Sequence, residues 1–316
     1  MASMLYATNS LGGFLSAPEL SQKLRVAAQP LKRFRAFTSP LGAGGAHRNA
    51  NVFFDKIGNV AAAGGVLVET NTIAETTVGV QQGTATMQEY GNAIAYTGRL
   101  ISLSQLSPED AIAIALRNDA AKILDSAAGT QFTSAEVKAV QSASGNVVFT
   151  TNGTATATAT VNLSGTNVRL GVDRLRKANI PFVDGANYVM ITAVGGYSGF
   201  FSDTATGGFV DVSKYTDLLA QNMFRGEIGK YYMTRIVEET NMLPNTIGSG
   251  AGLSAAVLFG DDAVKEVVAV PEELREKIPT DYGRSQGLAW YALLGFQKIW
   301  SQSTDSEEHI IHYTSA

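Results

Sequence analysis

Apolar residues recur every three to four positions between Ser107 and Gly129, which is the spacing of one face of an α-helix. Ser107 is a typical N-cap, Pro108 suits the first helical position, and Gly129 is a typical helix end. The pattern therefore predicts a helix of about 30 Å. Its expected buried face carries Ile112, Leu116, Ala120, Ile123, Leu124 and Ala127, and its expected exposed face carries Asn118, Asp119, Lys122 and Asp125.

A β-type pattern precedes this helix. Residues 52–70 and 84–100 have strand-like composition and flank a Gly- and Thr-containing stretch at 75–83. This order predicts a long β-hairpin. A two-stranded hairpin is at best marginally stable alone in water, so we expect this one to lie against another surface, such as that of another chain.

Strands and helices alternate in the rest of the chain. Thr and Ala alternate at 154–163, which predicts a half-buried strand paired with 146–151 around the Asn152-Gly153 turn. The later patterns predict helices at 167–178, 197–201, 213–222 and 272–277, a loop at 244–253, and strands at 187–194, 230–239, 256–259, 287–296 and 309–313. The chain is therefore expected to have an α+β fold.

Composition narrows the class of protein. The 316 residues are 45% hydrophobic and 16% charged, which is enough apolar material for a core without disulfides or a structural metal. The absence of cysteine excludes thiol nucleophiles, thiolate metal sites and iron–sulfur clusters. No signal peptide opens the chain, and no apolar run reaches the ~18 residues of a membrane span. We expect a soluble protein made in a reducing compartment, with no membrane partner.

Charge is uneven along the chain. The first fifty residues hold six basic side chains and one acidic, whereas the remainder holds 18 basic and 27 acidic. Breakers at Pro18, Pro30, Pro40 and residues 42–45 indicate an extended arm. Its basic residues indicate either a solvated tail or an arm that lies against a polyanion or crosses a neighbouring subunit.

One sequence resembles a catalytic motif. Ser198 follows a predicted strand in Gly-Gly-Tyr-Ser-Gly, and Asp261, His309 and His312 lie downstream. The nucleophile elbow needs Gly two positions after Ser, where this chain has Phe200. A serine hydrolase therefore stays a distant alternative.

No other pattern indicates catalysis or a bound cofactor. His309 and His312 are three apart in a predicted strand, so they face opposite sides and cannot share one metal ion. No phosphate-binding Gly motif occurs, and the acidic and basic residues of 272–277 fit a solvated helix. We therefore expect no cofactor, no metal and no enzymatic activity.

The order of arm, long hairpin, long helix and α+β body resembles the major capsid proteins of tailed bacteriophages over nearly the whole length. Residues 168–194, with Asn179-Ile180-Pro181, a glycine turn and Tyr188-Val189-Met190-Ile191, are similar to that family's entry into the axial domain. Further similar segments are Gly226-Glu227-Ile228-Gly229, residues 256–261 and residues 290–296.

The resemblance implies an extended N-terminal arm, a long β-hairpin called the E-loop, a long spine helix, and mixed α/β peripheral and axial domains. The implied boundaries are 1–51 for the arm, 52–104 for the E-loop, 105–178 for the peripheral domain with spine helix and Thr/Ala hairpin, 179–285 for the axial domain, and 286–316 for the return to the peripheral domain.

The implied function is self-assembly into pentamers and hexamers of an icosahedral shell that encloses the double-stranded DNA genome of a tailed phage. The implied partners are further copies of the chain, scaffolding and portal proteins, DNA held non-specifically on the inner face, and a decoration protein. The protein would be assembled in the bacterial cytoplasm and reside in the virion. Alternatives are an encapsulin-like compartment and, suggested by sequons at Asn152 and Asn162, a secreted adhesin.

An exposed hairpin and a basic arm are liabilities on a monomer and become interfaces in a shell. The expected assembly residues come from these two segments and from the Gly turn. They are Lys23, Arg25, Lys32, Arg33, Arg35, Phe53, Phe54, Lys56, Val66, Val68, Val78, Val80, Tyr90, Gly226 and Gly229.

Overall fold

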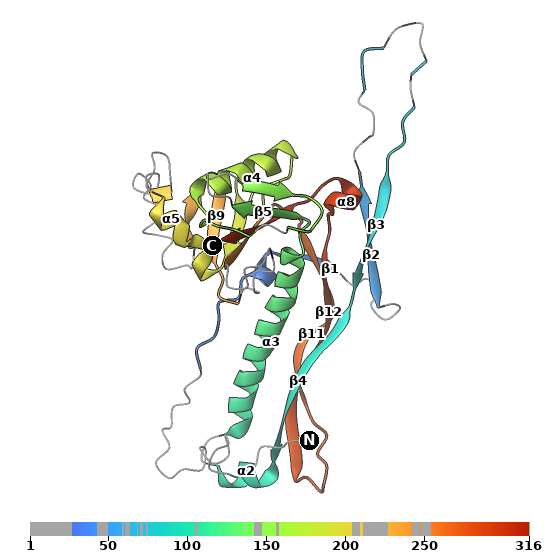
Figure 1. Ribbon diagram of the computed structural model, residues 1–316. Coiled ribbons are helices and arrows are strands. Elements are labelled where there is room, and N and C mark those ends of the chain that lie inside the picture. Colours follow the sequence, from blue (N-terminus) through green and yellow to red (C-terminus); the bar gives the residue numbers. More distant parts are fainter. Residues whose placement is uncertain are drawn as a thin grey trace.

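The computed structural model of the chain is an elongated molecule built from two sheets, one long helix and one projecting hairpin (Figure 1). Helix α3 (Pro108–Thr133) runs along a four-stranded sheet, and a seven-stranded sheet lies beyond the carboxyl end of the helix. The structure describes residues 27–42, 50–58, 60, 64–67, 69, 72–73, 75–104, 107–141, 147–155, 158–203, 209–210, 227–241, 247 and 254–315.

The four-stranded sheet joins distant parts of the sequence. Its strand order is β1 (Ser39–Gly42), β11 (Val264–Glu276), β12 (Ser285–Lys298) and β4 (Gln88–Thr97). β1 is parallel to β11, and the other neighbours are antiparallel. The short helix α2 (Gly98–Leu103) follows β4 at the far end of the molecule (Figure 1).

The seven-stranded sheet forms the broad end of the molecule, with helix α4 (Gly165–Lys177) packed on it through Val168, Val172 and Leu175. The turns η1 (Phe34–Phe37) and η2 (Val194–Tyr197) and the short helices α5 (Ser198–Ser202) and α8 (Gln302–Asp305) complete the described elements. The sheet order is β6 (Val147–Thr150), β5 (Val137–Gln141), β13 (Ile310–Ser315), β10 (Ser254–Phe259), β7 (Tyr188–Thr192), β9 (Thr234–Glu238) and β8 (Glu227–Tyr231).

The projecting hairpin, residues 51–86, extends past the seven-stranded sheet (Figure 1). Its strands β2 (Asn51–Ile57) and β3 (Val80–Thr86) pair antiparallel from Asn51 opposite Thr86 to Ile57 opposite Val80. β3 ends at Thr86, and β4 continues into the four-stranded sheet, so the predicted second arm at 84–100 is divided between two sheets.

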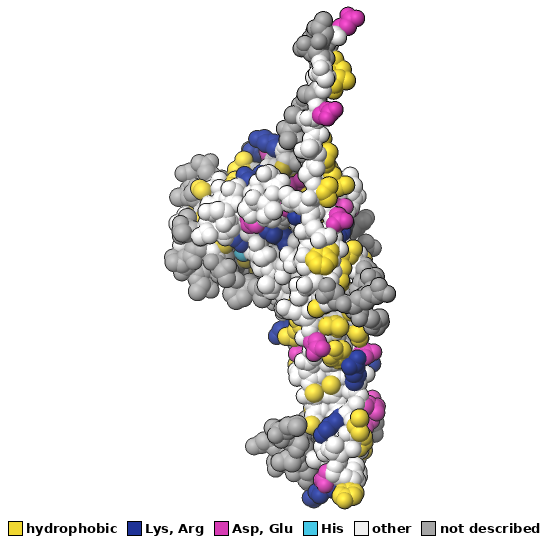
Figure 2. Space-filling model, turned by 90° about the vertical axis from the view of Figure 1, so that its right-hand side faces the viewer, with side chains coloured by type: hydrophobic (Ala, Val, Ile, Leu, Met, Phe, Trp, Pro, Cys, Tyr) yellow, Lys and Arg dark blue, Asp and Glu magenta, His cyan; other side chains and the backbone are white. Residues whose placement is uncertain are grey.

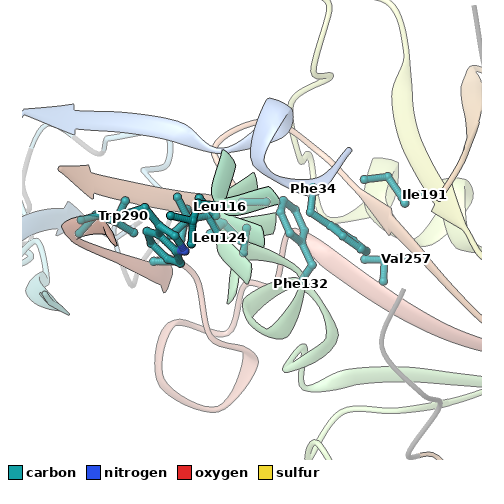
Figure 3. Packing of buried hydrophobic residues seen from close by; sticks show 14 of the residues in the cluster. Phe34, Leu116, Leu124, Phe132, Ile191, Val257 and Trp290 are labelled. Atoms are coloured by element: carbon teal, nitrogen blue, oxygen red, sulfur yellow. The ribbon is translucent and has the colours of Figure 1, made fainter. Parts of the chain in front are cut away.

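Helix α3 connects the two sheets through one core (Figure 3). Its buried face packs against Trp290 on the four-stranded sheet and, through Phe132, against Phe259 of β10 at a ring distance of 4.8 Å. Ser107 caps the helix by accepting a hydrogen bond from the Asp110 N–H at 3.3 Å, as expected. Beyond Pro108 at the start of the helix, the buried apolar side chains are those of Ile112, Leu116, Ala120, Leu124, Ala128 and Phe132.

The structure corrects three details of the predicted helix. It continues through Gly129 to Thr133. A Cβ at Gly129 would lie 3.0 Å from a carbon of the Phe34 ring, so this Gly serves close packing rather than helix termination. Ile123 is 40% exposed, whereas Asp125 is buried because it accepts hydrogen bonds from the arm.

Other expectations were wrong. Residues 272–277 lie mostly in strand β11, because β12 pairs with them. Residues 154–163 contain no described strand, and β6, the expected partner of that segment, pairs with β5 instead. The predicted strand at 230–239 is two strands joined by a turn at Tyr232 and Met233. The predicted helix at 213–222 and almost all of the loop at 244–253 lie outside the described residues.

The expected domain boundaries stay a prediction, and the two sheets distribute those segments as follows. β5, β6 and α4, expected with the spine helix, belong to the seven-stranded sheet, and so does β13. β11, expected in the axial domain, belongs to the four-stranded sheet. Among the described helices, none is long and apolar enough to cross a membrane.

Candidate assembly surfaces

The projecting hairpin has two unlike faces, because successive residues of a strand point to opposite sides. Phe53, Ile57 and Val80 point away from the molecule and are 51%, 71% and 66% exposed. Further along, Val66 is fully exposed and Val78 is half exposed. Figure 2 shows apolar side chains as separate yellow groups along the narrow projection. The hairpin thus exposes several apolar side chains, with Asp55 between Phe53 and Ile57 on the same face.

The other face of the hairpin packs on the body at its root. Val52 and Phe54 join Ala85, Met87 and Val267 in a small apolar cluster. The Phe54 ring covers Gly83 so closely that a Cβ there would overlap it. Phe54 was expected in an assembly surface, but its half-buried side chain fixes the hairpin to its own subunit.

Lys56 also binds its own subunit. Its Nζ donates to Asp305 Oδ2 at 2.6 Å and to the Ile299 carbonyl at 3.2 Å, and it lies 5.8 Å from the centre of the Trp300 ring. The Lys56 and Asp305 side chains are 10% and 5% exposed, so the pair is largely removed from water. Lys56 is therefore not a free surface group of the hairpin.

The arm, where it is described, is attached to the body. Phe34 is buried with its ring 5.6 Å from Phe132, and the Leu31 N–H donates to Thr240 Oγ1 at 2.7 Å. Arg35 donates to Glu266 at 3.0 Å and to Glu272 at 2.8 Å. The positive charge of Arg35 is thus compensated within the subunit, contrary to a freely available basic arm.

The arm contacts two buried carboxylates of the body. The Arg35 N–H donates to Asp125 Oδ1 at 3.1 Å. The Arg33 backbone forms a hydrogen bond with the Glu239 carboxylate, and the Arg33 charge attracts that carboxylate. Burial raises the pKa of Asp125. Burial, reinforced by the nearby charge of Asp125, raises the pKa of Glu239 to about 7, although the Asn241 N–H and Arg33 oppose this shift. The arm junction therefore contains a carboxyl group that titrates near neutral pH.

The hydrolase constellation does not come together among the described residues. Ser198 Oγ donates to the Gly195 carbonyl at 2.9 Å. The ring nitrogens of His309 contact the Asp261 carbonyl and Glu307. His312 Nδ1 lies 3.1 Å from Lys138 Nζ, and burial, followed by the charge of Lys138, lowers the pKa of His312 to about 3. Both histidines are thus engaged away from Ser198.

The remaining expected assembly residues divide into three groups. Tyr90 is half-buried against the main core, and Gly229 is buried under Phe209, so both pack within their own subunit. Lys32 and Arg33 are half-buried on the arm. The residues outside the described part of the chain are Lys23, Arg25, Val68 and Gly226. No cluster of three or more His, Asp or Glu side chains suited to a metal ion occurs in the described segments.

Sequence reasoning missed the partners of Lys56. Asp305 lies 249 residues from Lys56 in the sequence, and no local pattern connects them. It also missed Ile57, although its two-residue spacing from Phe53 on one strand face was a usable signal.

Comparison with known proteins identifies the fold. No protein-family model matches the sequence, and no curated protein matches it significantly. Among solved structures, the capsid of Helicobacter pylori bacteriophage KHP30 superposes with a TM-score of 0.70 at 11% identity, covering 98% of this chain and 97% of that one.

Two further solved structures match this chain over a similar length. The capsid asymmetric unit of cyanophage Pam1 gives a TM-score of 0.67 at 14% identity and covers both chains completely. The capsid of Ralstonia phage GP4 gives 0.64 at 14% identity, covering 99% of this chain and 98% of that one. The shared architecture therefore spans the whole chain.

Proposed function

We propose that this chain, which has the tailed-phage capsid fold, is a major capsid protein that assembles into the icosahedral shell around a double-stranded DNA genome. The observation that carries the proposal is the projecting hairpin. Its outward face carries the exposed side chains of Phe53, Ile57 and Val80 around Asp55, Val66 further along is fully exposed, and its root packs on the body. Such a segment is suited to contact another copy of the subunit.

Burial of the hairpin's exposed apolar side chains against a neighbouring copy would supply free energy for association. Burying a fully exposed Val, Leu or Ile side chain contributes roughly 1.5–3 kcal/mol. Phe53, Ile57 and Val80 lie in one row, so one flat surface of a neighbour can cover all three. Because hairpin and receiving surface differ, the contact is heterologous, and repeated heterologous contacts close into rings and cages.

The proposed partners follow from this role. They are further copies of the chain in pentamers and hexamers, scaffolding and portal proteins, packaged DNA on the inner face, and a decoration protein on the outside. Since Glu266 and Glu272 compensate Arg35, contact between the arm and DNA would fall on Lys23, Arg25 and Lys32. The protein would assemble in the bacterial cytoplasm and reside in the virion, with a structural rather than catalytic role.

The test is assembly of the purified chain, alone and with its scaffold, followed by sedimentation and negative-stain imaging. We expect closed particles or rings of five and six subunits. A monodisperse monomer under all salt and scaffold conditions contradicts the proposal. Particles that enclose a cargo protein and no DNA in their host would instead indicate an encapsulin-like compartment.

A further inference from the structure

The segment 299–305, which contains Trp300 and helix α8, lies between the root of the hairpin and the body. On the hairpin side, Lys56 of β2 reaches Asp305 and the Ile299 carbonyl. Gln81 of β3, opposite Lys56 in the ladder, donates to the Thr304 carbonyl at 3.4 Å. Both strands of the hairpin are therefore bound to this one segment.

On the body side, Glu136 holds the same segment. Its carboxylate accepts from Ser301 Oγ at 2.6 Å and from the Ser303 N–H at 2.7 Å. Burial alone would raise the pKa of Glu136, but these hydrogen bonds and the charge of Lys298 lower it to about 2. Glu136 thus stays ionised and keeps its hydrogen bonds throughout the physiological pH range.

Lys298 extends this attachment to both sheets. Its Nζ lies 2.9 Å from Glu308 and 3.4 Å from Glu136. Lys298 ends β12 of the four-stranded sheet, whereas Glu136 and Glu308 precede β5 and β13 of the seven-stranded sheet. The segment is consequently fixed to the body at the place where the two sheets meet.

Without this segment, the hairpin root depends on a small apolar cluster whose buried members among the described residues are Ala85, Met87 and Val267. The Lys56–Asp305 pair lies beyond that cluster along the hairpin, where a fixed contact restrains rotation about the root. Asp305 Oδ2 also accepts from the Ser301 N–H at 2.9 Å, so the carboxylate is itself held in place.

We propose that segment 299–305 sets the direction in which the hairpin leaves the body, with Lys56 and Asp305 as its positioning residues. The ion pair is largely buried from solvent, so loss of either partner leaves an uncompensated buried charge and releases the hairpin. The consequence for assembly rests on the proposed function. If only about one hairpin in ten points in the competent direction, the apparent affinity for a neighbour falls about tenfold.

The direct test is made on the unassembled full-length subunit. The chain has no cysteine, so Val78→Cys on the hairpin and Thr166→Cys on α4 provide unique sites for two nitroxide labels. Double electron–electron resonance should give one narrow distance in the parent and in Lys56→Arg, which keeps the charge. Lys56→Met should broaden and shift that distance.

A matched control is Lys265→Met, which removes an ion pair with Asp262 on the body and should leave the distance unchanged. If Lys56→Met does not fold, the double variant Lys56→Met with Asp305→Asn replaces it, because it leaves no buried charge and retains an acceptor for the Ser301 N–H. A narrow, unshifted distance in the folded variant overturns the proposal, since the apolar root then suffices.

Light scattering of assembling subunits tests the consequence separately. We expect Lys56→Met to assemble about tenfold more weakly than the parent, in line with the smaller competent fraction. Equal assembly despite a released hairpin overturns the role of the pair in assembly. If no version assembles, the proposed function fails, and the distance measurement still decides whether segment 299–305 directs the hairpin.

Discussion

Removal of residues 59–78 separates folding of the subunit from assembly. Ile57 and Val80 face each other in the ladder, and the Gly58 N–H donates to the Gly79 carbonyl at 2.9 Å. The deletion leaves Gly58-Gly79 as a two-residue turn, which suits a tight β-hairpin because Gly readily adopts positive φ. It also preserves β2, β3 and the apolar root.

The effect on the fold should be small. Every described residue between 60 and 79 is exposed, so no core contact is lost there. Closing a loop of 2 instead of 22 residues lowers the chain-entropy cost by up to about 2 kcal/mol. The free energy of unfolding should therefore stay equal or rise slightly.

The effect on assembly should be large. The deletion removes Val60, Val66, Leu67, Ile73 and Val78, whose exposed fractions run from 49% to 100%. At roughly 1.5–3 kcal/mol per fully buried side chain, their burial against a neighbour contributes on the order of 5 kcal/mol per subunit. Such a loss weakens each contact by about a thousandfold or more.

Thermal melting reports the fold, and sedimentation with electron microscopy reports the particles. A control that keeps the loop length, Val66→Ser with Leu67→Ser and Ile73→Ser, should lose assembly for the same reason. If the deletion unfolds the body, the hairpin tip belongs to the subunit core and our reasoning is wrong. Normal shells from the deletion variant would show that the tip is not an interface.

Three further perturbations test the interior. Leu116→Asp should lower the free energy of unfolding by several kcal/mol because Leu116 is 1% exposed on α3, whereas Ile123→Asp on the open face should change it by less than about 1 kcal/mol; equal losses in urea would contradict the assigned face. Glu239 has its pKa raised from 4.5 to about 7, so its stabilisation is present below pH 4.5 and is lost as pH rises through 7. Glu239→Gln should match the parent's melting temperature at pH 4 and exceed it at pH 8, and parallel pH profiles would refute this. Gly171→Ala places a Cβ into the buried Tyr313 hydroxyl and should cost about 1–3 kcal/mol, partly recovered by adding Tyr313→Phe; no recovery in calorimetry would assign the loss elsewhere.

Sequence patterns correctly predicted those helices and strands that are determined by residues close together in the sequence. Ser107 and Pro108 mark the start of α3, and Leu116 and Leu124 lie on its buried face, as expected. The order of arm, hairpin, long helix and α+β body was enough to predict the capsid fold, which the solved structures confirm.

Contacts between residues far apart in the sequence explain the sequence-based predictions that were wrong. Residues 272–277 have the charge spacing of a helix, but β12 pairs along them and Arg275 lies 4.0 Å from the Tyr291 ring, so tertiary contacts override helix propensity. Thr and Ala alternate at 154–163, yet alternation alone provides no strand partner. The contacts of Lys56 and Arg35 depend on acidic residues more than two hundred positions away, which no local pattern can reveal.

The strand order of the four-stranded sheet constrains when a newly made chain can complete its fold. Ser39 pairs with Lys265 and Gln88 pairs with Leu294, so the first strands wait for partners roughly 200 residues later in the chain. At about 5–20 residues per second, a ribosome needs on the order of 10–40 s to reach them. The hairpin root needs Val267, and segment 299–305 emerges later still. We therefore expect that a nascent chain cannot hold the hairpin in its proposed direction, and that only completed subunits enter the proposed assembly.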